Sequence, residues 1–292
     1  MVVYLTKFKN LKYKKNKTVF LRSKTILPGF GLSFGISLLS LSLLVFLPFA
    51  MLVYSTVGIG WDKFWQTILQ EQVISAISLT LKMSLFAVLT NCIFGTMIAW
   101  VIVRYHFPFK SLINAIVDLP FALPTAVTGI ALATLYSPNG WIGQWFNFKI
   151  AFTPIGIWIA LVVVSLPFIV RTVQPVLEDL SVELEEAGAT LGANSWTIFY
   201  RIILPELLPA LIMGAGMAFA RATGEYGSVI FIAGNIPNVS EILPVIITAK
   251  LEMFDTQGAS AVALFMLLIS FVILFVFNVA QWFFSRRLGA KV

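Results

Sequence analysis

The chain has 292 residues, of which 59% are hydrophobic and 11% are charged, and its mean hydropathy is +0.93. Soluble domains carry about a quarter charged residues, so this composition excludes most soluble enzymes and predicts an all-α polytopic membrane protein. A single cysteine, Cys92, and a single histidine, His106, exclude a disulfide framework and a His/Cys metal cluster. We therefore expect no metal site and no catalytic residue in this chain.

Six apolar runs follow one another along the chain. A transmembrane helix takes about 20 apolar residues, and the lack of water in a bilayer favours helices over open strands. The predicted spans cover residues 30–54, 79–103, 113–135, 155–173, 207–233 and 260–284. They predict a membrane domain, residues 30–284, between a basic tail, residues 1–29, and a C-terminal segment, residues 285–292.

The basic residues predict the orientation. Fifteen of the 20 Lys and Arg residues lie in the tail, in the second and fourth connections and after the last span. Such an excess marks the cytoplasmic side, so both termini are predicted to be cytoplasmic, or stromal in a plastid. The net charge of +7 could instead indicate a nucleic-acid-binding arm, but its distribution follows the membrane and we expect no nucleic-acid partner. The first apolar run exceeds the signal-peptide core of about 7–15 residues, so we expect it to be retained.

The third span contains two prolines one helical turn apart, Pro120 and Pro124. Each proline removes a helix hydrogen bond, so we expect the helix to break twice. Broken helices in transporters tend to line the path of the solute, although an ordinary packing kink explains the pattern equally well. Pro120 and Pro124 are therefore candidates for the translocation path. Asp118, near the cytoplasmic end of this span, is expected to pair with a base or to face water.

Two short helices are predicted in the fourth connection. Ser181 is a candidate N-cap of the first helix, and Gly192 suits its C-terminal end. Asn194 or Ser195 can cap the second helix, and Pro205 is expected to close the connection.

The same connection, residues 174–205, is acidic although it lies on the basic side of the membrane. Five acids and no base lie between Glu178 and Glu186. A helix that lies on a membrane surface usually carries Lys or Arg on its polar face. An acidic helix is better matched to a basic pocket on a partner protein, so we favour docking over a surface-lying helix.

The fifth span contains a pair of opposite charges, Arg221 and Glu225. They are four residues apart, so on a helix they share a face and can form an ion pair. One interpretation is a salt bridge with no ligand. The other is that Arg221 lines a path for an anion that Glu225 holds or releases, since charges within a membrane are usually functional. Lys82, near the outer end of the second span, is expected to extend toward water.

The fourth connection also carries a family motif. Glu186-Ala187-Gly188, three residues, Gly192, nine residues and Ile202-Ile203-Leu204-Pro205 resembles the EAA loop of binding-protein-dependent ABC importers. Gly188 stands where that family has alanine. The resemblance implies the type I ABC importer permease fold. It also implies a coupling helix that sits in a cleft of an ATPase subunit, with Glu186 paired to a base there. The residues assigned to this coupling are Glu186, Ala187, Gly188, Gly192, Ile202, Leu204 and Pro205.

The chain has no G-x-x-x-x-G-K-[ST] motif for binding nucleotide phosphates. We therefore expect ATP and Mg²⁺ to be bound by the partner ATPase, and this chain to bind no cofactor. It is predicted to be a transport subunit and not an enzyme.

Longer blocks resemble the T-type subunit of the sulfate/thiosulfate ABC permease. They include DLPFALPTAVTGIALATLYSPNG, residues 118–140, and GEYGSVIFIAGNIP, residues 224–237. The resemblance implies a sulfate or thiosulfate importer with a W-type permease partner, two copies of an ATPase and an external sulfate-binding protein. A molybdate or tungstate permease is the alternative, and a secondary anion transporter, which needs no docking helix, is a further one. The richness in Phe, Ile and Lys suggests an AT-rich genome, so a bacterial inner membrane and a plastid (chloroplast) envelope are both expected locations.

Overall fold

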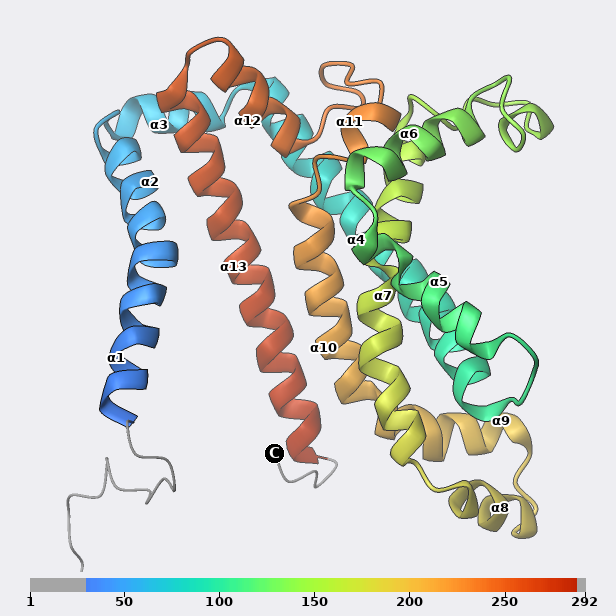
Figure 1. The fold of residues 1–292 in the computed structure, drawn as a ribbon. Coiled ribbons are helices and arrows are strands. Elements are labelled where there is room, and N and C mark those ends of the chain that lie inside the picture. Colours follow the sequence, from blue (N-terminus) through green and yellow to red (C-terminus); the bar gives the residue numbers. More distant parts are fainter. Residues whose placement is uncertain (1–29, 288–292) are drawn as a thin grey trace, which may run out of the picture. The chain divides into compact units, whose positions relative to one another are not determined.

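The structure, a computed structural model, describes residues 30–287 (Figure 1). The predicted basic tail and the last five residues lie outside this range. Helices and their connections make up the described range, and no strand occurs in it. The chain divides into two compact units, Met1–Met51 and Leu52–Val292, which are described separately.

The first unit contributes one helical run. It consists of α1 (Phe30–Leu41), one π-helical turn, η1 (Ser42–Phe46), and the start of α2 (Leu47–Val57). No residue of α1 or η1 is buried. The run from Phe30 to Val57 is long and apolar enough to cross a membrane, which agrees with the first predicted span.

The second unit holds the other helices. They are α3 (Trp61–Ile68), α4 (Glu71–Arg104), α5 (Lys110–Ala122), α6 (Thr125–Tyr136), η2 (Gly143–Trp145), α7 (Pro154–Asp179), α8 (Val182–Thr190), α9 (Ser195–Ile198), η3 (Phe199–Ile203), α10 (Leu204–Thr223), α11 (Val229–Ile232), α12 (Leu243–Glu252) and α13 (Thr256–Arg287). Among the described residues of both units, five helices are long and apolar enough to cross a membrane, or six if α5 and α6 form one broken span.

The core of the second unit lies between α4, α7 and α10, which run side by side, and α13 packs along α10 and α12 (Figure 1). Glycines allow the close approach of the three central helices. A Cβ on Gly95 of α4 would lie 2.9 Å from Ile169 of α7, and one on Gly214 of α10 would lie 2.2 Å from the Thr172 hydroxyl. Membrane helices associate without a hydrophobic driving force between them, and small residues at their crossings allow the close packing that holds them together.

The third predicted span is broken once and not twice. Pro120 lies inside α5, which continues to Ala122, whereas Pro124 stands between α5 and α6. The two helices meet at 110°. Proline disfavours the α conformation of the residue before it, and Leu123 is indeed extended. The helix therefore turns at Pro124.

The predicted end of the fifth span is wrong. α10 ends at Thr223 with Gly224 as its C-cap, and residues 224–242 form turns around the short helix α11. Beyond this end, Gly227 packs so close to Thr125 that a Cβ would lie 2.2 Å from its hydroxyl. Glu225 therefore lies beyond α10 and not on its face.

The start of the fifth span also differs from the prediction. α9, η3 and α10 form one continuous helical run from Ser195 to Thr223, so Pro205 does not close the connection. It occupies the first turn of α10 directly after the π-turn η3. A proline lacks the N–H that the helix would use and its ring crowds the carbonyl four residues before it, and a widened π-turn accommodates both.

Candidate functional site

The two predicted cytoplasmic helices form a separate element, α8 followed by α9. They lie at the end of the second unit where α4 and α7 also end (Figure 1). The Ser181 hydroxyl accepts the N–H of Glu183 at 3.2 Å, so Ser181 is the N-cap of α8 as predicted. Asn194, and not Ser195, caps α9, because its Oδ1 accepts the Thr197 N–H at 2.8 Å.

Gly192 ends α8 in the way that the sequence predicts. Its φ of +82° belongs to the left-handed region that glycine adopts without strain. The N–H of Gly192 donates to the Ala189 carbonyl and that of Ala193 to the Gly188 carbonyl. This bond pair is a Schellman motif, which satisfies carbonyls at a helix end and turns the chain sharply toward α9.

Gly188 is the contact point between α8 and the helical run that follows. The residue is buried, and a Cβ there would lie 3.1 Å from Ile202 and 3.2 Å from Ile198. The nearest atom of Ile202 is its terminal Cδ1, and that of Ile198 is its Cγ1. Gly188 and Ile202, two members of the family motif, thus hold α8 against α9 and η3. Leu204 and Pro205 lie at the start of α10 and are partly buried.

The outer face of α8 combines acids with apolar side chains. Glu186 and Ala187 are exposed, and so are Leu184 and Leu191, the latter to 88%. The acidic stretch is divided between two helices, because α7 continues through Asp179 and α8 begins at Val182. α8 itself therefore carries three acids and not five.

One acid of α8 is paired within the chain. Glu185 accepts a hydrogen bond from Arg104 Nη2 at 2.7 Å, and the same nitrogen donates to the Leu180 carbonyl at 3.1 Å. In the sequence Arg104 is one of many bases on the cytoplasmic side, so no local signal distinguishes it. Its partner lies 81 residues away, and only the fold brings the two together.

Arg221 and Glu225 form an ion pair at the end of α10. Glu225 is only 2% exposed, and its Oε1 accepts both the N–H and the hydroxyl of Ser228 at 2.9 Å. Arg221 is 32% exposed and contacts Glu225 through Nη1. The carboxylate is therefore fully engaged, whereas the guanidinium still faces accessible space.

The break after α5 lies against the turn that holds Glu225. Besides the contact of Gly227 with Thr125, a Cβ on Gly129 of α6 would lie 2.3 Å from the Ser228 carbonyl oxygen. The first turn of α6, which follows Pro124, thus packs directly on residues 227 and 228. The fold brings together Pro124 and the Arg221–Glu225 pair, which the sequence suggested separately, while Pro120 lies a turn earlier in α5.

Asp118 of α5 pairs with a base, as expected. Arg171 of α7 donates to its two carboxylate oxygens at 2.8 and 2.5 Å, and also to the Asn114 carbonyl and to Gln174. Arg171 lies inside α7. This fork-like pairing anchors the first half of the broken span to the core helix α7.

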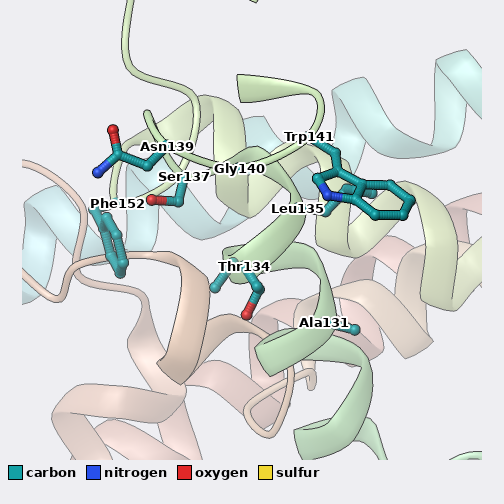
Figure 2. A pocket seen from close by; sticks show the side chains of 9 residues that line it. Ala131, Thr134, Leu135, Ser137, Asn139, Gly140, Trp141 and Phe152 are labelled. Atoms are coloured by element: carbon teal, nitrogen blue, oxygen red, sulfur yellow. The ribbon is translucent and has the colours of Figure 1, made fainter. Parts of the chain in front are cut away.

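Pockets on this unit lie away from the ion pair, and two of them are large. One, of about 780 Å³, lies at the end of α6, where the rings of Trp141 and Phe152 stand on opposite sides with Thr134 between them (Figure 2). The other, of about 850 Å³, is an apolar groove between α4 and the start of α10 that includes Trp100 and Trp196. Neither is lined by Arg221 or Glu225, so neither adds to the candidate path.

Residues 91–290 match the family model described as "Binding-protein-dependent transport system inner membrane component". The chain belongs to this family. The permease is 46% identical over 268 residues to the "Sulfate transport system permease protein CysT" of Escherichia coli (strain K12), which covers 91% of this chain and 97% of that protein. It is 44% identical over 270 residues to the "Probable sulfate transport system permease protein cysT" of Marchantia polymorpha, with 91% and 92% covered.

Solved structures show the same fold at low sequence identity. A chain of a bacterial ABC transporter involved in the import of alginate superposes with a TM-score of 0.71 at 16% identity, over 86% of the permease and 95% of that chain. A chain of the MetNI methionine ABC transporter, in an inward-facing conformation, gives 0.58 at 18% identity, over 72% and 95%. The permease therefore has the type I ABC importer permease fold, is all-α and crosses the membrane several times.

Proposed function

We propose that this permease is the T-type subunit of an ATP-driven importer of sulfate that also accepts thiosulfate. The main support is its identity of 46%, over 91% of its length, to a protein named as a sulfate transport permease. Its place is a bacterial inner membrane or a plastid envelope, with both termini on the cytoplasmic or stromal side.

The Arg221–Glu225 pair suits a site that an anion passes. A sulfate dianion would meet the exposed part of Arg221, while Glu225, held by Ser228, keeps the guanidinium in place and offsets part of its charge. A path needs binding that is strong enough for entry and weak enough for release. An arginine that shares its charge with a fixed carboxylate meets both demands.

The α8 element suits contact with a motor protein. Its exposed face offers Glu186 beside the apolar Leu184 and Leu191, and this mixture is typical of a docking surface with a basic rim and an apolar centre on the partner. The partner in this proposal is an ABC ATPase, present in two copies, that binds ATP and Mg²⁺. A W-type permease and an external sulfate-binding protein complete the complex.

The test is purification of the permease with its partners, followed by reconstitution into vesicles and measurement of ATP hydrolysis and sulfate uptake. We expect the binding protein loaded with sulfate to stimulate both. Stimulation by molybdate with none by sulfate would transfer the permease to the molybdate/tungstate class. Uptake that survives ATP depletion while an ion gradient remains would instead indicate a secondary anion transporter.

A further inference from the structure

The bond between Arg104 and Glu185 is largely shielded from water. The side chains are 14% and 22% exposed. The Arg104 guanidinium also lies over the ring of Trp100, at 5.7 Å from its centre, and Trp100 packs edge-on against Phe199 of η3. An ion pair with a second acceptor and an aromatic contact is held in one geometry, unlike an exposed pair.

This bond joins α8 to a helix that is distant in the chain. α8 is linked covalently to α7 through Leu180 and to α10 through α9 and η3, whereas α4 has no such link. Among the described residues, the bond from Arg104 to Glu185 is the polar contact that joins a side chain of α8 to another helix. Without it, a displacement of α8 would reach α4 only indirectly, through α7 and α10.

The opposite end of α4 holds a second set of polar contacts. Gln72 donates to the buried Glu241 at 2.6 Å, and the Thr80 hydroxyl accepts the N–H of Leu243, the first residue of α12, at 2.9 Å. These contacts fix the distal segment, residues 236–243, which folds on itself through a bond from the Ile236 N–H to the Ser240 hydroxyl. The distal segment follows the turn that holds Glu225 in the chain, with α11 between them.

Between these ends α4 is one uninterrupted helix. Its 34 residues contain no proline and span about 50 Å. Asn91, at mid-length, donates to the Val162 carbonyl and to the Ser165 hydroxyl of α7. A helix without a proline or a bulge has no point at which it bends sharply, so we expect its two ends to move together.

We propose that α4 is a transmission rod between α8 and the distal segment, and that Arg104 is the positioning residue that couples the rod to α8. The inference rests on the proposed function, since it assumes that an ATPase moves α8. It adds a route by which that motion reaches the opposite end of the molecule and the stretch that follows Glu225.

The experiment places one spin label at a time on each end of this route. Cys92 is the single cysteine, so a Cys92→Ser chain is the parent. Val182→Cys labels the start of α8, outside the docking face, and Val239→Cys labels the distal segment; both positions are exposed. Spectra of the permease–ATPase complex are recorded with and without ATP and Mg²⁺, in the parent and in the Arg104→Gln and Glu185→Gln variants. Glu206→Gln, an exposed acid outside the ion pair, is the matched control.

We expect ATP to change the spectrum at both positions in the parent and in the control. In Arg104→Gln and Glu185→Gln the change at position 182 should remain, while the change at position 239 should fall at least about fivefold, the lower range of a coupling free energy. The double variant should behave like either single variant, because all three remove the ion pair between residues 104 and 185. A merely structural role would instead reduce the response at both positions.

Three outcomes overturn the proposal. They are an unchanged response at position 239 in Arg104→Gln, an equal loss at both positions, and a parent without any response to ATP. The proposed substrate is tested separately on the same parent by sulfate uptake. A parent that responds to ATP at both positions but takes up no sulfate contradicts the substrate, and the variants still decide the role of α4.

Discussion

The carboxylate of Glu225 takes three donors in a place that water hardly reaches. Arg221 Nη1 contacts one oxygen, and the N–H and hydroxyl of Ser228 occupy the other. A buried carboxylate with this many partners has its hydrogen-bonding capacity satisfied, so Glu225 serves to hold Arg221 and the turn. A variant in which both residues are uncharged tests whether the exposed part of Arg221 contacts the transported anion.

We predict that Arg221→Gln combined with Glu225→Gln abolishes most sulfate uptake without loss of assembly. A single change would leave one charge without its partner, which is strongly destabilising when that charge is buried. The double variant removes both charges and keeps side chains that can hydrogen-bond. Uptake in vesicles should fall at least about tenfold, the equivalent of about 1.4 kcal/mol, at an unchanged melting temperature. Normal uptake in the double variant would mean that the two residues form only a structural pair.

Glu186 allows a second prediction at the level of one residue. It is exposed and outside the contacts that hold α8 in place, so Glu186→Lys should change the stability of the permease by no more than about 0.5 kcal/mol. If Glu186 faces a base of the ATPase, the reversed charge costs several kcal/mol at the interface. Co-purification of the ATPase should then fall at least about tenfold, whereas Glu206→Lys should retain it. A full complement of ATPase on Glu186→Lys would contradict the docking assignment.

At the scale of helices, the broken span depends on a contact with another element. α6 follows Pro124 at an angle of 110° to α5, and its first turns pack on residues 227 and 228. The two stretches are far apart in sequence and have no side chain at Gly129 or Gly227 to separate them. Close backbone approach of this kind fixes the position of a bend that a proline only permits.

Gly129→Ala should separate α6 from the turn that holds Glu225. A Cβ would lie 2.3 Å from the Ser228 carbonyl oxygen and 2.7 Å from its Cα, and backbone atoms cannot move aside as a side chain can. Overpacking of this kind costs about 1–3 kcal/mol, which exceeds the gain of up to about 1 kcal/mol from alanine in a helix. We expect a lower melting temperature and reduced uptake.

The control for this change is Gly35→Ala in α1, where a Cβ would meet nothing within 4 Å. It should leave the melting temperature unchanged or raise it slightly through helix propensity. Equal melting temperatures for Gly129→Ala and the parent would show that α6 can move away from residues 227 and 228 at little cost.

For the whole molecule, the sidedness of α8 can be measured directly. α8 lies at one end of the second unit, and the loop with Trp141, which is 84% exposed, follows α6 at the other end (Figure 1). The distribution of Lys and Arg puts the α8 end in the cytoplasm. In a Cys92→Ser chain, an impermeant maleimide should therefore label Leu191→Cys from the cytoplasmic side and Trp141→Cys from the other side. Labelling of position 191 from outside would make contact with a cytoplasmic ATPase impossible, and the proposed function would have to be abandoned.

The sequence alone determined the features that depend on neighbouring residues. The length of the apolar runs predicted the helices, Ser181, Gly192 and Asn194 predicted the ends of α8 and α9, and Pro124 predicted a break. Each of these depends on hydrogen bonds or backbone angles within a few residues, so local chemistry is sufficient.

The tertiary structure alone decided where α10 ends, which acid of α8 is bonded to another helix, and which residues α6 packs against. The turn after α10 packs through Gly227 against Thr125, and the state of Glu185 depends on Arg104, 81 residues away. In a chain that is apolar nearly throughout, hydrophobic periodicity does not tell which helix faces which. Contacts between distant residues therefore leave no pattern in the sequence, and only the packed helices reveal them.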